Sequence, residues 1–308
     1  MSKIDDLKNN INKYFVGKND VVDNVLICLL AGGHVLLEDV PGVGKTMLAR
    51  TTAKSMDVSF NRIQFTPDTL PSDVVGMSIY NMKTGEFQYK KGSVMAEIIL
   101  ADEINRTSPK TQSSLLEAMA EGQISVDGEV YKLPNPFMVI ATQNPIEFLG
   151  TYPLPEAQMD RFMMRLHIGY PDEDNEILMV KNILDNKTLE TVESVCTADD
   201  VIAMKDEVSK VFISDKVLGY IREIIELTRQ EQRYVLGASP RATIALTRAS
   251  QAHAYLEGRD FVKPDDVKAV AANVLEHRLV LVSEARISGE NPDSILKSII
   301  VKAKVPME

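Results

Sequence analysis

Apolar residues in the first half of the chain fall into short runs, and helical patterns separate several of these runs. The run at 34–39 is apolar almost throughout, which is typical of a strand buried on both faces of a parallel sheet. A stretch with apolar residues at helical spacing precedes it at 17–33 and ends in glycines. This alternation predicts a doubly wound α/β sheet. Further strands are expected at 60–65, 97–103, 137–144 and 163–170, and further helices at 47–56 and 109–122.

Two segments of the first half have a different pattern, in which apolar and polar residues alternate around a central turn. They lie at 78–94 and 123–133, and their turns contain Thr84-Gly85 and Asp127-Gly128. Glycine in such a turn accommodates the backbone that a tight hairpin requires. We therefore predict two β-hairpins inserted into the α/β core.

The strand signals fade beyond Pro171, and helical patterns follow to the end of the chain. Thr197 and Ser214 stand where helix N-caps are expected. We therefore predict an α/β domain at 1–170 and a smaller all-α domain at 171–308. The helical patterns of the second domain lie at 173–184, 197–212, 214–230, 241–258 and 263–279.

The segment 38–46, with the sequence EDVPGVGKT, follows the first predicted strand and opens a helix. Backbone N–H groups at such a junction converge on one point, where the positive end of the helix attracts anions. Lys45 adds a positive charge there, and the hydroxyl of Thr46 is a ligand for Mg²⁺. The usual pattern begins with glycine, whereas this chain has Asp39. The predicted nucleotide-binding residues of this loop are Pro41, Gly42, Val43, Gly44, Lys45, Thr46 and Met47.

Two adjacent carboxylates, Asp102 and Glu103, end the predicted strand at 97–103. Because the carboxyl ends of parallel strands share one edge of a sheet, these side chains are expected near the phosphate loop. Asp102 would then hold Mg²⁺ together with Thr46, and Glu103 would orient and activate the attacking water. Such a pair taken alone is more often simply two solvated acids at the end of a strand.

Further polar residues are candidates for contact with the γ-phosphate. Asn144 ends the strand at 137–144, where its amide would hold the attacking water, sense the γ-phosphate or cap the following turn. Arg161 and Arg241 are candidates for stabilising the transition state, since a guanidinium is planar and always charged. Spacing alone does not favour them over Arg165 or Arg233.

Composition restricts the possible functions further. The 308 residues include 34 basic and 44 acidic side chains, so the net charge of −10 disfavours non-specific binding to nucleic acid. The most apolar segment, 25–37, is shorter than a membrane helix requires and contains two glycines and a histidine. Cys28 lies in this apolar segment, where a buried free thiol favours a reducing compartment. We expect a cytoplasmic protein without a leader peptide or membrane insertion.

Five sequence blocks in a fixed order resemble the AAA+ ATPases, and more closely the MoxR family. They read LLEDVPGVGKT, RIQFTPDTLPSDVVG, ADEINRTSPKTQSSLLEAMAEGQISV, ATQNPIE with GTYPLPEAQMDRF, and GASPRAT. The resemblance covers nearly the whole chain. It implies a P-loop NTPase (AAA+) core with β-hairpin inserts and a helical lid, and it implies ATP and Mg²⁺ as ligands.

The resemblance also implies a role in ATP binding or hydrolysis for individual residues. These are Lys45 and Thr46 of Walker A, Asp102 and Glu103 of Walker B, Asn144 as sensor 1, Arg161 as the arginine finger that reaches a neighbouring subunit, Arg241 as sensor 2, and Val16 and Gly17 beside adenine. The two hairpins match inserts that face the central pore of a ring.

An arginine finger that reaches a neighbouring subunit implies that each ATP site is shared between two subunits. The resemblance therefore implies a homo-oligomeric ring, for which a hexamer is expected. Family members resemble chaperone-like remodelers of proteins that often work with a von Willebrand factor A-domain (VWA) partner. One alternative is the motor subunit of a metal chelatase. Another is a nucleic-acid motor, but only the first hairpin is rich in lysine, and the second has two acids against one lysine. A nucleotide switch that does not hydrolyse is disfavoured by Glu103.

Overall fold

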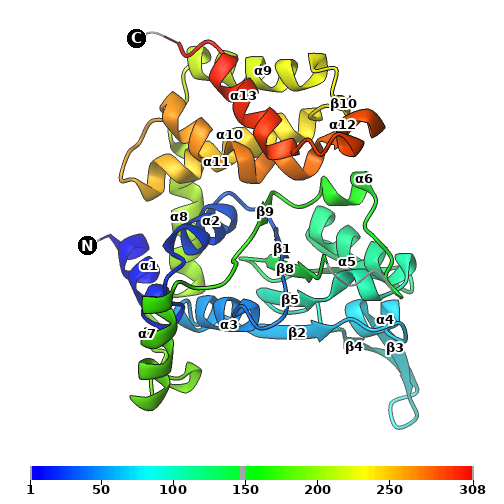
Figure 1. Cartoon of the computed structure of the whole chain (residues 1–308). Coiled ribbons are helices and arrows are strands. Elements are labelled where there is room, and N and C mark those ends of the chain that lie inside the picture. Colours follow the sequence, from blue (N-terminus) through cyan, green and yellow to red (C-terminus); the bar gives the residue numbers. More distant parts are fainter. Residues whose placement is uncertain (1, 146–149, 307–308) are drawn as a thin grey trace.

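A parallel five-stranded sheet forms the core of the computed structural model, which describes residues 2–145 and 150–306 (Figure 1). All five strands are among those that the sequence predicted. The last is much shorter than expected, because the main chain after it turns to the Asp39 carboxylate instead of continuing the sheet. In spatial order the strands are β2 (Phe60–Gln64), β5 (Ile98–Asp102), β8 (Met138–Gln143), β1 (Val35–Glu38) and β9 (Met164–Leu166).

Helices cover both faces of this sheet, as a doubly wound fold requires. Along β1, Val35 and Leu37 pack into one hydrophobic cluster, and Leu36 packs into the other. The strand is therefore buried on both faces, which explains its uninterrupted apolar sequence. One face is covered by α1 (Lys3–Tyr14), α2 (Asn19–Leu30) and α3 (Lys45–Ser55), and the other by α4 (Pro71–Val75) and α5 (Pro109–Glu121).

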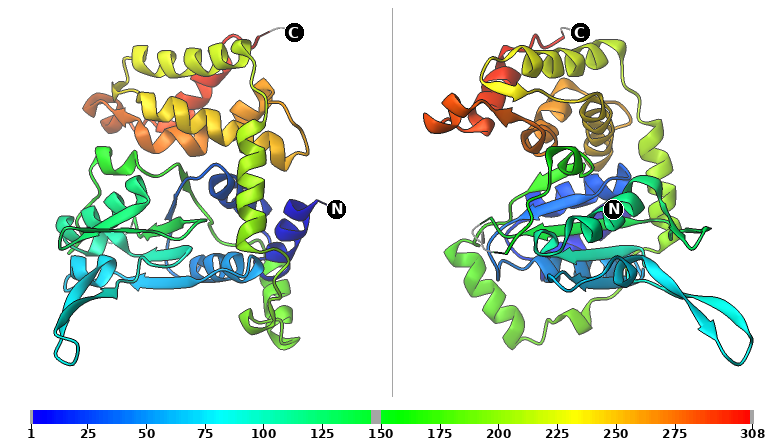
Figure 2. Two further views of the ribbon diagram at one scale, coloured as in Figure 1. Left: turned by 180° about the vertical axis from the view of Figure 1, so that it is seen from behind. Right: turned by 90° about the vertical axis from the view of Figure 1, so that its right-hand side faces the viewer.

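Both predicted hairpins are present. The first, β3 (Gly76–Asn81) and β4 (Glu86–Lys91), projects from the body of the protein (Figures 1 and 2). The second consists of β6 (Gln123–Val126) and β7 (Glu129–Lys132). Stacked rings of Tyr89 and Tyr131, with centroids 4.0 Å apart, join the two hairpins at their bases.

The segment after Pro171 begins with α7 (Glu173–Leu184) and the short helix η2 (Leu189–Thr191). Hydrogen bonds attach this segment to α1 and α3, since Tyr14 Oη donates to the carbonyl of Thr191 and Lys54 Nζ to that of Leu189. We propose that the chain consists of two domains, at 1–170 and 171–308.

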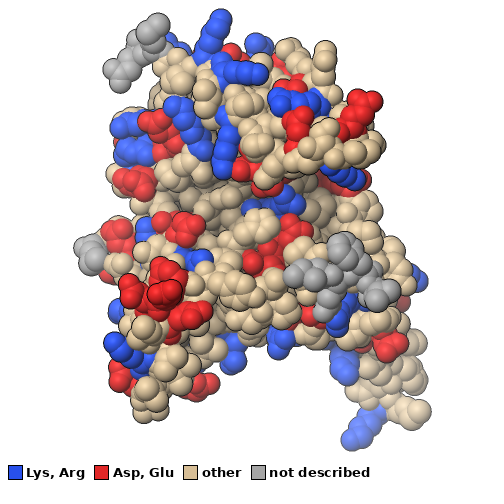
Figure 3. Space-filling model, in the orientation of Figure 1, with Lys and Arg blue, Asp and Glu red and all other residues tan. Residues whose placement is uncertain are grey.

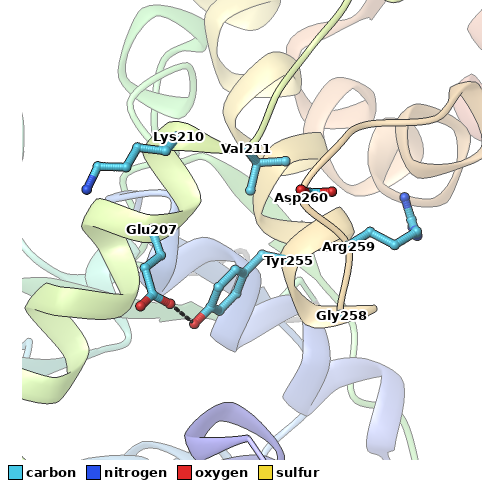
Figure 4. Close-up of a pocket in the computed structure, with 7 residues that line it drawn as sticks. All are labelled: Glu207, Lys210, Val211, Tyr255, Gly258, Arg259 and Asp260. Carbon is cyan, nitrogen blue, oxygen red and sulfur yellow. Dashed lines mark hydrogen bonds between the residues drawn. The ribbon is translucent and has the colours of Figure 1, made fainter.

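The remaining chain forms a helical lid, which lies above the sheet in Figure 1. Tyr255 Oη of α10 donates to Glu207 Oε2 of α8 at 2.6 Å and so ties the connecting helix to the lid (Figure 4). A small pair of strands in the lid was not predicted. No helix in the described part of the chain is long and apolar enough to cross a membrane. The elements are α8 (Ala198–Lys210), α9 (Asp215–Gln230), β10 (Tyr234–Leu236), α10 (Pro240–Leu256), α11 (Pro264–Leu275), η3 (Glu276–Arg278), β11 (Val280–Leu281), α12 (Ser283–Ile287) and α13 (Pro292–Lys302).

Candidate functional site

Three neighbouring strands end together at the carboxyl edge of the sheet. In the order β5, β8 and β1, the register places Leu37 beside Thr142 and Glu38 beside Gln143, with Ala101 of β5 beside Ala141. The phosphate loop, the Asp102-Glu103 pair and Asn144 therefore emerge at one edge, as the sequence predicted. The arrangement matches the usual place of ligand sites in open α/β sheets.

The phosphate loop has the backbone that its glycines permit. Gly42 and Gly44 have φ of 90° and 93°, in the region that other residues rarely adopt. Gly44 is the N-cap of α3 and makes no side-chain cap, so the first N–H groups of that helix remain available to an anion. Val43 is buried in the core, so it can contribute to the loop only through its backbone.

Lys45 begins α3, and its Nζ donates to the main-chain oxygen of Asp39. Burial lowers the pKa of Lys45 from its ordinary value, while the nearby carboxylates of Asp39, Asp102 and Glu103 partly oppose this shift. On the face shown in Figure 3, acidic and basic side chains lie near one another in the hollow between the sheet and the lid.

Asp39, the residue that departs from the usual phosphate-loop pattern, has a structural task. Its buried carboxylate accepts hydrogen bonds from the backbone N–H groups of Ile168 and Gly169, the latter at 3.2 Å. These bonds tie the start of the phosphate loop to the chain that leaves β9 for the lid. The aspartate therefore replaces a loop glycine without occupying the space where phosphate would bind.

Restoring the consensus glycine in an Asp39→Gly variant is expected to destabilise the protein. Two hydrogen bonds to a charged group are lost, and the free energy of unfolding should fall by about 3 kcal/mol. Denaturation by urea measures this change. Asp39→Asn keeps the shape and one acceptor oxygen, so its loss should be smaller. An unchanged unfolding free energy in Asp39→Gly would show that the two bonds contribute nothing.

The two carboxylates that follow β5 are held by the adjacent strand β8. Thr142 Oγ1 donates to Asp102 Oδ1 at 2.7 Å and accepts the backbone N–H of Glu103 at 2.9 Å. Asp102 Oδ2 also pairs with Arg62 at 2.6 Å. Asp102 is therefore fixed in orientation, with its charge partly compensated from β2.

Glu103 has a φ of 57°, an uncommon value for a residue with a side chain, and it turns the chain sharply away from β5. Its Oε2 accepts from Gln64 Nε2 at 3.0 Å and pairs with Arg106 at 3.3 Å. Sequence analysis missed both Gln64 and Thr142 as partners of this site. Their spacing carries no signal, because each meets the carboxylates only across neighbouring strands.

The structure also shows where Asn144 and the predicted adenine segment at 16–17 lie. Asn144 follows β8 and is buried. A Cβ on Gly17 would lie 2.5 Å from the Asn175 side chain, so the predicted adenine segment at 16–17 fits closely against the start of α7. Ile146 and Glu147, within the fourth sequence block, lie outside the described residues.

The donors at this edge fit a magnesium–nucleotide complex. Mg²⁺ prefers carboxylate and hydroxyl oxygens, and Asp102 and Thr46 supply one of each. Uncapped N–H groups at the start of α3 and the ammonium of Lys45 match phosphate oxygens.

The two predicted arginines lie elsewhere. Arg161 and Arg241 line one pocket together with Gly33 and His34, which immediately precede β1. The phosphate loop begins after the opposite end of β1, whose four residues span about 13 Å. Within the described part of the chain the side chain of Arg161 bonds only the carbonyl of Leu116, at 3.1 Å, and Arg241 has no ion pair. Arg248 and Arg278 also line this pocket.

The two alternative arginines are engaged within the subunit. Arg165 bridges Glu38 at 3.1 Å and Glu276 of the lid at 2.9 Å. Arg233 pairs with Glu231 at 2.8 Å and with Glu290 at 3.1 Å. Arg161 and Arg241 are thus better suited than these two to meet an anion from outside the subunit.

Comparison with known proteins agrees with this geometry. A model of the "ATPase family associated with various cellular activities (AAA)" matches residues 34–164, and an "AAA lid domain" model matches 226–299. The chain is 52% identical to uncharacterized protein YeaC of Bacillus subtilis, over 97% of this chain and 93% of YeaC. It is 38% identical to chaperone MoxR1 of Mycobacterium tuberculosis, over 96% of this chain and 80% of MoxR1. A crystal structure of a "putative ATPase" from Cytophaga hutchinsonii superposes with a TM-score of 0.92 at 42% identity, covering 99% of this chain and 95% of that one.

Proposed function

This chain belongs to the MoxR family of AAA+ ATPases, and we propose that it hydrolyses ATP within a ring of identical subunits to remodel protein clients. The observation that carries this proposal is the separation of the site into two halves. The phosphate loop and the carboxylates lie at one edge of the sheet, whereas Arg161 and Arg241 line a pocket at the other. In a ring, a second copy would bring the two halves together.

Each residue of the carboxyl edge has a task in this reaction. Lys45 and the N–H groups of residues 42–47 bind the phosphates, and Val16-Gly17 borders adenine. Thr46 and Asp102 hold Mg²⁺, which when bound neutralises charge on the phosphates. Glu103 accepts the proton of the attacking water, and Asn144 orients that water.

The arginines of the adjacent copy complete the site. Arg161 and Arg241 approach the γ-phosphate from the neighbouring subunit, where two fixed positive charges stabilise the charge that develops in the transition state. A monomer would then hydrolyse ATP slowly. The ring, expected to be a hexamer, is therefore part of the active site.

Mixing two inactive variants tests this arrangement. Arg161→Ala and Glu103→Gln subunits, each nearly inactive alone, should regain ATP turnover when assembled together, measured as phosphate release. In mixed rings an intact arginine of one variant meets the intact carboxylates of the other.

The control mixture combines Lys45→Ala with Glu103→Gln. Both changes lie at the carboxyl edge, so every site stays damaged and turnover should not return. Mixed rings of Arg161→Ala and Glu103→Gln that stay inactive, although light scattering shows them assembled, would contradict a shared site.

The β3–β4 hairpin supports protein rather than nucleic acid as the client. Near its tip the side chains of Met82 and Phe87 are 92% and 73% exposed, and Tyr80 is also exposed. Exposed apolar groups of this kind mark surfaces that contact proteins. Hydrolysis would move these hairpins against a client in the pore, and a VWA-domain protein is the expected partner. We expect this ATPase itself to act in the cytoplasm.

A further inference from the structure

Asp160 lies immediately before Arg161 and makes bonds that reach into the lid. Its Oδ1 accepts from Arg278 Nε at 2.6 Å, and its Oδ2 accepts from Ser239 Oγ at 3.1 Å. Asp160 follows the short helix α6 (Glu156–Met159), Arg278 ends η3, and Ser239 precedes α10, so the three residues lie far apart in the sequence. One carboxylate therefore joins three segments.

Arg278 fixes the backbone on both sides of Arg161. Its side chain is only 3% exposed, and its Nη2 donates to the carbonyls of Asp160 at 3.3 Å and Phe162 at 2.7 Å. Nη1 donates to the carbonyl of Met163 at 3.2 Å. The chain that carries Arg161 is thus clamped by a buried guanidinium of the lid.

Ser239 links the same carboxylate to Arg241. It is the N-cap of α10, where its Oγ accepts from the N–H of Ala242 at 3.2 Å, and Arg241 lies in the first turn of that helix. The bond to Asp160 therefore holds the start of α10 against the base of Arg161. The two arginines come from different parts of the fold but line one pocket.

We propose that Asp160 is a positioning residue that holds Arg161 and Arg241 as one rigid unit for the nucleotide site of the adjacent subunit. The proposal rests on the proposed function, in which both arginines act on a neighbour's ATP. A displacement of the lid then moves both guanidinium groups together. Because correct placement of reacting groups accounts for much of catalysis, loosening this unit should lower turnover in the neighbouring site.

Ser239→Ala is the informative variant, because changing Asp160 itself would leave the charge of Arg278 buried without its carboxylate. Ser214→Ala is the matched control. Ser214 caps α9 of the same lid, and its Oγ accepts from Val217 N–H at 3.3 Å. Both variants lose a serine N-cap, but only Ser239→Ala loses a bond to Asp160.

In assembled rings we expect Ser239→Ala to lower kcat roughly tenfold, with little change in KM for ATP, because the neighbour's arginines act mainly on the transition state. Ser214→Ala should stay close to the unmodified protein in both constants. Equal effects of the two substitutions would overturn the proposal and reduce Ser239 to a helix cap.

Mixed rings identify which subunit's nucleotide site depends on the hydrogen bond between Ser239 and Asp160. Rings of Ser239→Ala with Glu103→Gln should exceed the summed turnover of the separate variants, because intact arginines of one face intact carboxylates of the other. Absence of this gain would show that Ser239 serves its own subunit's site and would overturn the proposal. If Arg161→Ala with Glu103→Gln also fails to gain, the shared site itself is wrong. If that mixture gains and the Ser239→Ala mixture does not, only the role of Asp160 fails.

Discussion

A Lys45→Ala variant is expected to bind ATP roughly 100-fold more weakly than the unmodified protein, the upper range for losing a hydrogen bond to a charged group. Lys45 begins α3 directly after the loop glycine Gly44, where its ammonium is placed to meet the expected phosphates. Turnover should fall further than affinity, since the same charge stabilises the transition state. Titration calorimetry with ATP and Mg²⁺ measures the affinity.

Lys54→Ala provides the matched control. Lys54 lies in the last turn of the same helix, at the end opposite the loop, and its Nζ donates to the carbonyl of Leu189. ATP affinity of this variant should be unchanged. Tight ATP binding by Lys45→Ala would mean that the nucleotide binds elsewhere, and the assignment of the phosphate loop would then be wrong.

Glu103→Gln should keep ATP binding while its turnover falls by about 100-fold or more, the usual contribution of a general base. Glutamine has the shape of glutamate, so it can occupy the same backbone and bond to the partners across the strand. It cannot accept the proton of the attacking water. Phosphate release under saturating ATP measures turnover, and calorimetry measures binding.

Glu97→Gln is the control for this change, because Glu97 precedes the same strand β5 at the opposite edge of the sheet. Its carboxylate bonds Ser59 and lies far from the phosphate loop. This variant should hydrolyse ATP at the ordinary rate. If Glu103→Gln did so too, another group would have to be the base.

Because Glu103→Gln should hold ATP without releasing phosphate, it is also the variant with which to find the client. Rings of this variant loaded with ATP would keep the β3–β4 hairpins in one state. Proteins that copurify with such rings, but not with Lys45→Ala rings, are candidates for the client and for the VWA partner. The comparison separates nucleotide-dependent binding from simple adhesion to the exposed apolar hairpin.

Sequence patterns predicted the layers of the core well because they report on local surroundings. The apolar run at 34–39 indicated a strand buried on both faces, and β1 packs into both hydrophobic clusters. The turns at Gly85 and Gly128 indicated hairpins, and both glycines have positive φ there. β10 and β11 escaped prediction, since three and two residues are too few for a periodicity to emerge.

The site was predictable only in part. Gly42, Gly44 and Lys45 belong to one short segment whose geometry is local, so their pattern identified the phosphate loop. The order of the strand ends then placed Asp102 and Asn144 at the same edge. By contrast, the task of Asp39 depends on the N–H groups of Ile168 and Gly169, which lie 129 and 130 positions away in the sequence.

The chain's own pattern of residues thus determined the strands, the helices and a loop able to bind phosphate, because each depends on neighbours in sequence. Tertiary packing alone decided that Arg161 and Arg241 share a pocket at the edge opposite that loop. It also decided that Asp160 meets Arg278 and Ser239 across 118 and 79 positions. Such contacts depend on how the lid packs on the sheet, and no local periodicity records that packing.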